Sequence, residues 1–356
     1  MEMKSITTIS RILEPLYTGR KELVCLCAEH VRTSLLIHYC CGERPRLPKP
    51  SKIFDVCPCR YINGVDGIPV LPISELKGMR ADGIVILIAA EDQEFYQYLG
   101  LLYDELHCYY TTILPCTAIE AYFYAIEHNC EIQSTAGQFK DQKSRELYMN
   151  YWDSRITGRV YDPALYTENP YWGNDIVPIL KPDSTIILGG AYNGLHIDRA
   201  FELAPLINAM LFEPNPTWAD FLQEKYYKVP QVHVIPKALY YDNKTLFFDN
   251  TDELGAHICE TGTSSCIIDT IALDTLNLDN ISEIALDIEG AELFALTGAA
   301  ETIRRCKPVL AICAYHKISD YVEIPRMISG LGLNYHLYFR QHSCYYEESV
   351  IYAISS

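Results

Sequence analysis

The sequence predicts an α/β protein of two domains, each with an open parallel β-sheet, the second of which ends in an antiparallel hairpin. Three observations lead to this prediction. Apolar runs of strand length alternate with helical patterns in two series, along residues 22–113 and 174–354. A tyrosine-rich stretch separates the two series. With 356 residues, the chain is long enough to bury two hydrophobic cores.

Residues 1–116 predict a Rossmann-like domain. A lead-in helix within residues 1–19 precedes strands at 23–28, 52–56, 84–89 and 108–113, with helices at 31–41, 74–77 and 93–106 between them. The turn after the first strand, residues 27–31, lacks the glycines of a dinucleotide fingerprint and carries Glu29, which would repel a phosphate. We therefore expect no NAD binding of the usual kind, and a nucleotide-dependent activity of this domain is disfavoured.

Residues 117–175 predict a helical connector, with helices at 117–127 and 141–152. Its aromatic composition is unlike that of a flexible linker. Several of its tyrosines could line a cleft, although plain packing into a core or an interface is the preferred explanation for each of them. These residues are Tyr122, Tyr124, Tyr148 and Tyr151.

Residues 176–356 predict a doubly wound sheet. Strands are expected at 185–188, 207–212, 232–235, 284–288 and 308–314, followed by an antiparallel pair at 335–339 and 350–354. Helices are expected at 174–180, 196–204, 217–226 and 321–331. In sheets of this kind ligands bind at the carboxyl ends of the strands, so the residues that follow each strand are the candidate site.

The overall charge excludes several classes of partner. The formal net charge is -17, from 29 basic and 46 acidic residues, and no stretch concentrates lysine or arginine. Such a field disfavours nucleic acid and anionic membranes, which leaves a small molecule or another protein as partner. Because no apolar run reaches membrane-spanning length, we expect a cytoplasmic protein. A homo-oligomer is compatible with this composition.

Six of the fourteen cysteines lie in the first 60 residues. In a reducing compartment they are expected to pack as small apolar side chains. A zinc site is the alternative, but their spacing does not match paired C-x2-C motifs, and we predict no metal site. The six are Cys25, Cys27, Cys40, Cys41, Cys57 and Cys59.

Three carboxylates, Asp287, Glu289 and Glu292, follow the apolar strand at 284–288. Carboxylates packed against a buried strand need a donor, a cation or a ligand. For Glu289 and Glu292, placement in the first turn of a following helix is a sufficient alternative. Asp287 is therefore the strongest candidate for a site residue.

Other strand ends supply a glycine turn at 189–194, Glu213, and the pair Tyr315 and His316. Glycines let the backbone approach a ligand, and a carboxylate can accept both hydroxyls of a ribose. In this order and spacing, residues 144–354 resemble an FkbM-type methyltransferase, a class I fold that depends on S-adenosylmethionine. The segment around Gly67-Ile68-Pro69-Val70 resembles the nucleotide-fold domain often placed ahead of such enzymes. The matching pieces are Gly190-Ala191-Tyr192-Asn193-Gly194, Phe212-Glu213-Pro214-Asn215-Pro216, Ala238-Leu239, Leu273-Asp274-Thr275-Leu276, Asp287-Ile288-Glu289-Gly290-Ala291-Glu292, Gly298-Ala299, Lys307-Pro308 and Tyr315-His316-Lys317.

The resemblance implies a function and a set of roles. The expected activity is O-methylation of a small or saccharide-like hydroxyl acceptor. Asp287 would face the methyl-transfer site. His316 is the candidate general base, because histidine titrates near neutral pH and this one follows a strand that ends at the site, and a hydrogen-bonded structural histidine is the alternative. Glu289 would assist, either directly or by binding a divalent cation with Asp287. The residues implied to hold S-adenosylmethionine are Gly190, Ala191, Tyr192, Gly194, Glu213 and Asn215.

The chain departs from the family pattern at three places. Leu188 stands where the family has an acid at the end of the first strand, and Leu195 stands where a second acid is usual. The lysine expected before Asp287 is also absent, since Ala285 and Leu286 occupy that region. A degenerate fold that serves as a non-catalytic binding or scaffolding module is therefore the alternative hypothesis.

Overall fold

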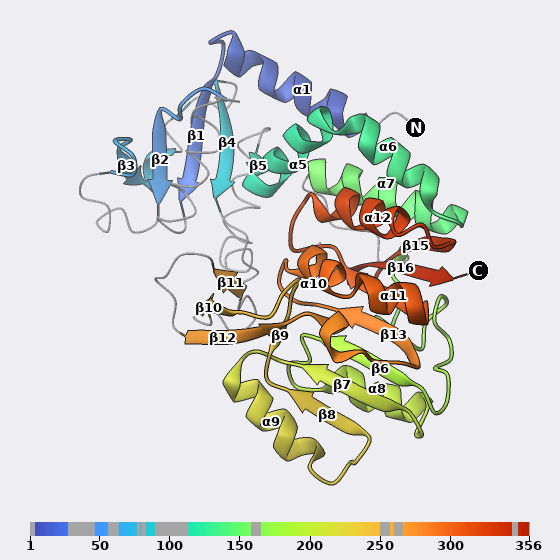
Figure 1. Ribbon diagram of the computed structural model, residues 1–356. Helices are drawn as coiled ribbons and strands as arrows, with labels where there is room; N and C mark the ends of the chain where they lie inside the picture. Colours follow the sequence, from blue (N-terminus) through green and yellow to red (C-terminus); the bar gives the residue numbers. More distant parts are fainter. Residues whose placement is uncertain are drawn as a thin grey trace. The chain divides into compact units, whose positions relative to one another are not determined.

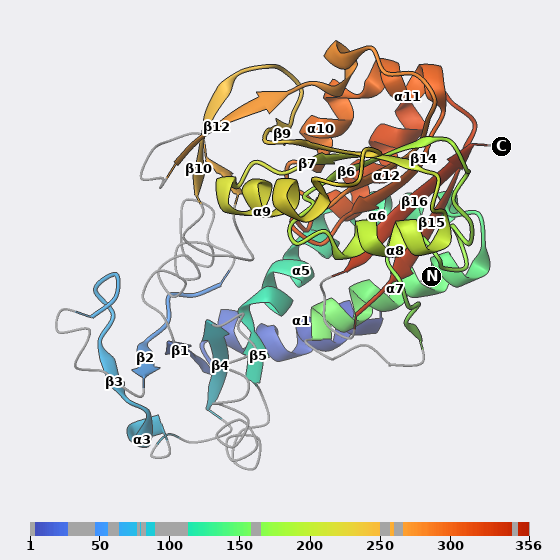
Figure 2. The same ribbon diagram turned by 90° about the horizontal axis from the view of Figure 1, so that it is seen from below.

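The computed structural model describes residues 4–27, 47–55, 64–76, 79, 83–89, 113–157, 165–249, 257–259, 266–343 and 348–355. The chain divides into two compact units. Unit 1 comprises Met1–Asn129 and Tyr151–Val160, and unit 2 comprises Cys130–Asn150 and Tyr161–Ser356. Figures 1 and 2 show the strands and helices of each unit.

Within its described residues, unit 1 contains a five-stranded sheet in the order β3-β2-β1-β4-β5. Every pairing in it is parallel, which confirms the predicted Rossmann-like sheet. The strands are β1 (Glu22–Cys27), β2 (Lys52–Asp55), β3 (Val70–Pro72), β4 (Ile84–Ala89) and β5 (Ile113–Pro115), and the helices are α1 (Lys4–Tyr17), α3 (Ile73–Leu76) and α5 (Cys116–Glu127). The helices expected at 31–41 and 93–106, the glycine-free turn after residue 27, and Cys40, Cys41, Cys57 and Cys59 lie outside the described residues.

The tyrosine-rich stretch forms helices whose aromatic rings pack inside the units. It continues from α5 into α6 (Asn129–Gln138) and α7 (Gln142–Thr157). In unit 1, Tyr124 stacks on Trp152 with ring centroids 5.7 Å apart. In unit 2, the buried Tyr148 donates a hydrogen bond of 3.2 Å to the carbonyl of Tyr321. Tyr148 is therefore a core residue, whereas Tyr124 is a partly buried residue that packs against a neighbouring helix.

Unit 2 is organised around a seven-stranded sheet in the order β15-β16-β14-β13-β6-β7-β8, counted over its described residues. Among these strands β16 alone runs opposite to the other six, so the doubly wound sheet with a closing hairpin is confirmed. Helix α8 covers one face, whereas α10 and α11 cover the other (Figure 2). The strands are β6 (Thr185–Gly189), β7 (Asn208–Phe212), β8 (Val232–Ile235), β13 (Ile281–Leu286), β14 (Val309–Cys313), β15 (Tyr335–Gln341) and β16 (Ser349–Ser355), and the helices are α8 (Leu195–Leu203), α9 (Pro216–Tyr226), α10 (Glu292–Gly298), α11 (Ala300–Cys306) and α12 (Asp320–Gly330).

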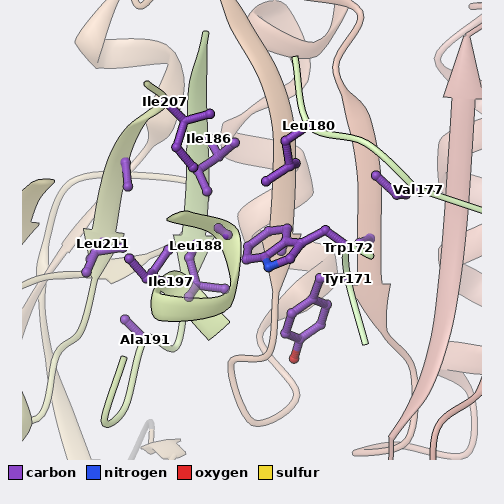
Figure 3. Packing of buried hydrophobic residues seen from close by; sticks show 14 of the residues in the cluster. Tyr171, Trp172, Val177, Leu180, Ile186, Leu188, Ala191, Ile197, Ile207 and Leu211 are labelled. Carbon is purple, nitrogen blue, oxygen red and sulfur yellow. The ribbon is translucent and has the colours of Figure 1, made fainter. Parts of the chain in front are cut away.

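The helix predicted at 174–180 is wrong. Asn174 Oδ1 accepts hydrogen bonds from the backbone N–H groups of Ile176 and Val177, at 2.9 and 2.8 Å, and so forms a local turn. Pro178 has no N–H with which to continue a helix. The segment instead contributes Val177 and Leu180 to the hydrophobic core (Figure 3).

A second, four-stranded sheet of described residues, in the order β11-β10-β12-β9, was not predicted. It is inserted in the chain between β8 and β13. Strands as short as these carry little periodic signal, because their stability comes from pairing with one another. Its strands are β9 (Ala238–Leu239), β10 (Thr245–Asp249), β11 (His257–Cys259) and β12 (Cys266–Ile271). Across the described parts of both units, every helix is too short or too polar to cross a membrane.

Candidate cofactor and catalytic site

The glycine turn that follows β6, residues 189–194, packs closely against the end of the neighbouring strand β13. Gly190 has a φ of +77°, and a Cβ at this residue would lie 1.8 Å from the carbonyl oxygen of Asp287. Gly194 has a φ of +75°, and a Cβ there would lie 2.5 Å from the hydroxyl of Tyr226. Both positions therefore require glycine because of neighbouring protein atoms. This packing also holds the turn directly against the carboxyl end of β13.

Glu213, which follows β7, joins two of the predicted cofactor residues. Its Oε2 accepts the N–H of Tyr192 at 2.9 Å, and its Oε1 accepts the N–H of Asn215 at 3.0 Å. The residue is 6% exposed. Burial raises the pKa of this carboxyl, while the two N–H donors act in the opposite direction. Each carboxylate oxygen keeps a lone pair that can accept a ligand hydroxyl.

The other predicted cofactor residues have mixed roles. The side chain of Ala191 is buried in the core, so only its backbone is available to a ligand. Asn215 Oδ1 accepts the N–H of Thr217 at 3.0 Å and caps α9. Tyr192, with a φ of 44°, packs its ring 4.1 Å from that of Trp218. The turn therefore offers a ligand its backbone and one aromatic pair.

Leu188 lies within the hydrophobic core of unit 2. It is fully buried in the same cluster as Trp172 and Ile197 (Figure 3). This position thus contributes apolar packing against α8 and no hydrogen-bond acceptor. Leu195, the first residue of α8, is 64% exposed.

Asp287 is held in place by two tyrosine hydroxyl groups. Tyr171 donates to Oδ2 at 2.9 Å and Tyr315 donates to Oδ1 at 2.8 Å. Burial, and secondly the charge of Asp287, raise the pKa of both phenols, so both remain protonated donors. Sequence reasoning placed Tyr315 at this strand end but missed Tyr171, because no local pattern connects residues 116 positions apart.

His316 lies among all three carboxylates of the stretch that follows β13. Its Nε2 is 3.4 Å from Asp287 Oδ1 and 3.3 Å from Glu289 Oε2, and its Nδ1 is 3.1 Å from Glu292 Oε1. Burial acts to lower the pKa of the imidazole, but the surrounding carboxylates, of which Glu292 is the strongest, raise it to about 9. An imidazole with this pKa carries a positive charge at neutral pH.

Glu292 is more than the first-turn helix acid that its position suggests. It is the first residue of α10, is wholly buried, and accepts the N–H of Ile288 at 2.9 Å through Oε1. Asp320, which begins α12, is 1% exposed. Burial and then the charge of Glu292 raise the pKa of Asp320 to about 7. Sequence spacing gave no sign that these acids share one buried region.

Glu289 is the most open member of the group, with a side chain that is 32% exposed. It has a φ of 54° and precedes Gly290, whose φ is 87°. A Cβ on Gly290 would lie 2.9 Å from Lys317 Cε, and Lys317 Nζ donates a hydrogen bond to the Gly290 carbonyl. This contact fixes the bend that carries Glu289 toward His316.

Comparison with known proteins agrees with this fold. Residues 203–340 match the FkbM methyltransferase domain. The crystal structure of Methyltransferase FkbM from Methylobacillus flagellatus KT matches with a TM-score of 0.60 and 18% identity, over 98% of this chain and 97% of its own. Precorrin-6y C5,15-methyltransferase from Geobacter metallireducens GS-15 matches with a TM-score of 0.33 and 12% identity, over 50% of this chain and 82% of its own.

Aeropyrum pernix fibrillarin, in complex with natively bound S-adenosyl-L-methionine, matches with a TM-score of 0.33 and 10% identity, over 49% of this chain and 67% of its own. No curated protein matches the sequence. The domain match lies within unit 2, whose strand order is that of a doubly wound sheet. Residues 203–340, all within unit 2, therefore match the FkbM methyltransferase domain, and the Methylobacillus flagellatus protein shares the fold of this chain.

Proposed function

We propose that this protein transfers a methyl group from S-adenosylmethionine to a hydroxyl group of a small-molecule or saccharide-like acceptor. The observation that carries the proposal is the contact between the backbones of Gly190 and Asp287. This contact places the glycine turn beside the acid group that follows β13, namely Asp287, Glu289 and Glu292. A methyl transfer needs two such neighbouring regions, one for the methyl donor and one for the acceptor. The FkbM domain supplies the reaction class.

Glu213 and the backbone of the glycine turn suit the cofactor. A buried carboxylate held by two backbone donors presents its free lone pairs in a fixed direction, as two ribose hydroxyls require. When bound, S-adenosylmethionine supplies an electrophilic methyl group. Leu188 departs from the family pattern here, so this chain would hold the cofactor without an acid at that position.

The acid group would bind the methyl acceptor and remove the proton from its hydroxyl group. Asp287 is oriented by two phenols and is suited to accept a hydrogen bond from an acceptor hydroxyl. The proton would leave through the Glu289–His316 pair, whose Oε2 and Nε2 atoms are 3.3 Å apart. Glu289 is the more accessible of the two, because the side chain of His316 is only 8% exposed. Direct proton abstraction by His316 is the alternative assignment, and it requires that the imidazole, whose pKa is raised to about 9, first lose its own proton.

A group of aromatic side chains supports a saccharide-like acceptor. Phe294, two residues after Glu292, packs against Tyr240 and Tyr241 with ring centroids 4.8 and 5.8 Å apart. Phe294 is 40% exposed and Tyr241 is 43% exposed, so their faces are open to a ligand. Lys317 Nζ lies 5.7 Å from the Phe294 ring centroid. Aromatic faces beside polar groups are the usual lining of a small-molecule site.

The decisive experiment measures cofactor binding and turnover separately. Isothermal titration with S-adenosylmethionine tests binding, and transfer of a labelled methyl group to a panel of saccharides and small alcohols tests catalysis. Binding together with transfer that Asp287→Asn abolishes would support the enzyme. Absence of binding at millimolar cofactor would contradict it.

The second candidate function is a non-catalytic binding module. The observation that favours it is Leu188, which fills with apolar atoms a position where the family has an acid. Absence of transfer to any acceptor, in the wild type as in Asp287→Asn, is the outcome that this candidate predicts.

A further inference from the structure

We propose that Asp287, Glu292 and His316 form a binding site for a first-row divalent metal ion, with Zn²⁺ and Mn²⁺ as the best candidates. Each residue offers one ligand atom, and these atoms all lie within 4.8 Å of one another. They come from the end of β13, the start of α10 and the segment after β14. Tetrahedral zinc ligands lie about 3.4 Å apart, so small side-chain rotations would complete the site.

The group holds buried polar atoms that lack hydrogen bonds. Within the described part of the chain, Glu292 Oε2 and both ring nitrogens of His316 are buried and make no hydrogen bond. Carboxylate oxygens lie 3.1 to 3.4 Å from those nitrogens, but not in the directions that an N–H donor requires. Native proteins rarely leave buried polar atoms in this state. A cation between them would use the lone pairs that hydrogen bonds do not.

The charges of the group also favour a cation. Three carboxylates, from Asp287, Glu289 and Glu292, face one imidazole, which can balance only one of them. Because His316 ligates a metal only as the neutral imidazole, the ion would displace the ring proton and would itself balance the charges of the two ligating acids, Asp287 and Glu292. Since burial makes uncompensated charge costly, the ion would have more effect here than at the surface.

The proposed ligands are already oriented by other groups. The hydroxyls of Tyr171 and Tyr315 hold both oxygens of Asp287, and the N–H of Ile288 holds Glu292 Oε1. Hydrogen bonds of this kind, made to the ligands themselves, fix the geometry of metal sites. One imidazole with two carboxylates suits Zn²⁺ or Mn²⁺ better than Mg²⁺, which prefers oxygen ligands alone. The inference stands whether or not the protein transfers methyl groups.

The test uses the full chain after treatment with a chelator. Titration calorimetry with ZnCl2 and MnCl2 should show saturable binding of about one ion per chain for at least one metal. Glu292→Gln and His316→Ala should each weaken binding at least 10-fold. The matched control is Glu301→Gln, because Glu301 lies in the first turn of the neighbouring helix α11 but has a 70% exposed side chain. No saturable binding to the wild type, or equal binding by the ligand variants, would overturn the proposal.

A measurement on the wild type alone covers the case in which the ligand variants do not fold. Co²⁺ bound by one imidazole and two carboxylates in a site of low coordination number absorbs strongly in the visible range. The hydrated ion, in contrast, absorbs weakly. Intense bands that appear in proportion to one Co²⁺ per chain and disappear on addition of Zn²⁺ would support the site, and a hydrated-ion spectrum would contradict it.

Discussion

The carbonyl oxygen of Asp287 occupies the space that a side chain on Gly190 would need, only 1.8 Å from the position of a Cβ. Two strands that are adjacent in the sheet, β6 and β13, thus end in direct backbone contact. The glycine of the turn is required by the protein itself, and a ligand need not be invoked to explain it. The same contact places the glycine turn beside the acid group.

Gly190→Ala should therefore destabilise unit 2 strongly. The left-handed φ alone costs an alanine about 1–2 kcal/mol, and the backbone overlap adds to that cost. Gly332→Ala is the matched control, because Gly332 has a φ of +69° and nothing within 4 Å of its Cβ position. Urea unfolding of both variants isolates the effect of the contact. If Gly190→Ala and Gly332→Ala lowered the free energy of unfolding equally, the turn would have moved away from Asp287 to make room for the alanine, and the prediction would be wrong.

Glu213→Gln should weaken S-adenosylmethionine binding by about 10- to 100-fold, because an amide cannot accept hydrogen bonds at both ends. Trp218 is a convenient probe, since its ring packs on Tyr192, whose N–H is bound to Glu213. The other two tryptophans, Trp152 and Trp172, are fully buried. Cofactor titrations should change the tryptophan emission of the wild type, with a much higher midpoint in the variant. The exposed Glu224→Gln provides the control.

Asp287→Asn should lower kcat by at least about 100-fold while the affinity for the cofactor changes little. Asn has one acceptor oxygen in place of two, so one of the two phenols loses its partner. Tyr315→Phe tests orientation separately from chemistry, because it removes one donor and keeps the carboxylate. Steady-state rates together with calorimetry measure both variants. An Asp287→Asn protein with full turnover would exclude this residue from the mechanism.

His342 should make the stability of unit 2 sensitive to mild acid. Burial lowers the pKa of this imidazole from 6.5 to about 4, although its contact with the Thr167 carbonyl acts in the opposite direction. In the unfolded chain the side chain binds a proton near pH 6.5, so its contribution is complete above that pH and is lost as the pH falls toward 4. The loss is on the order of 3 kcal/mol. Urea unfolding at pH 7 and pH 5 should show a smaller pH effect in His342→Gln than in the wild type.

Much of the fold can be predicted from the sequence, because the periodic patterns of strands and helices are local. The strands at 84–89 and 232–235 were predicted with the bounds that the structure has. Glu213 and Asp287 could be singled out because the signals at successive strand ends occur in a specific order and spacing, and because a carboxylate packed against a buried strand needs a partner. The helix expected at 174–180 failed because the side chain of Asn174 formed a turn that apolar periodicity does not report.

Tertiary structure alone decided which acids act together. The sequence paired Asp287 with Glu289 and treated Glu292 as an acid in the first turn of a helix. The fold instead buries Glu292 beside His316 and joins Asp287 to Tyr171 by a hydrogen bond. These contacts connect segments that are distant in sequence, and strand order, which no local pattern reports, brings them together. The sequence by itself therefore indicated the resemblance to FkbM-type methyltransferases and the strand ends that form the candidate site. The folded sheet determined the shared buried site, because only packing can place an imidazole among three carboxylates.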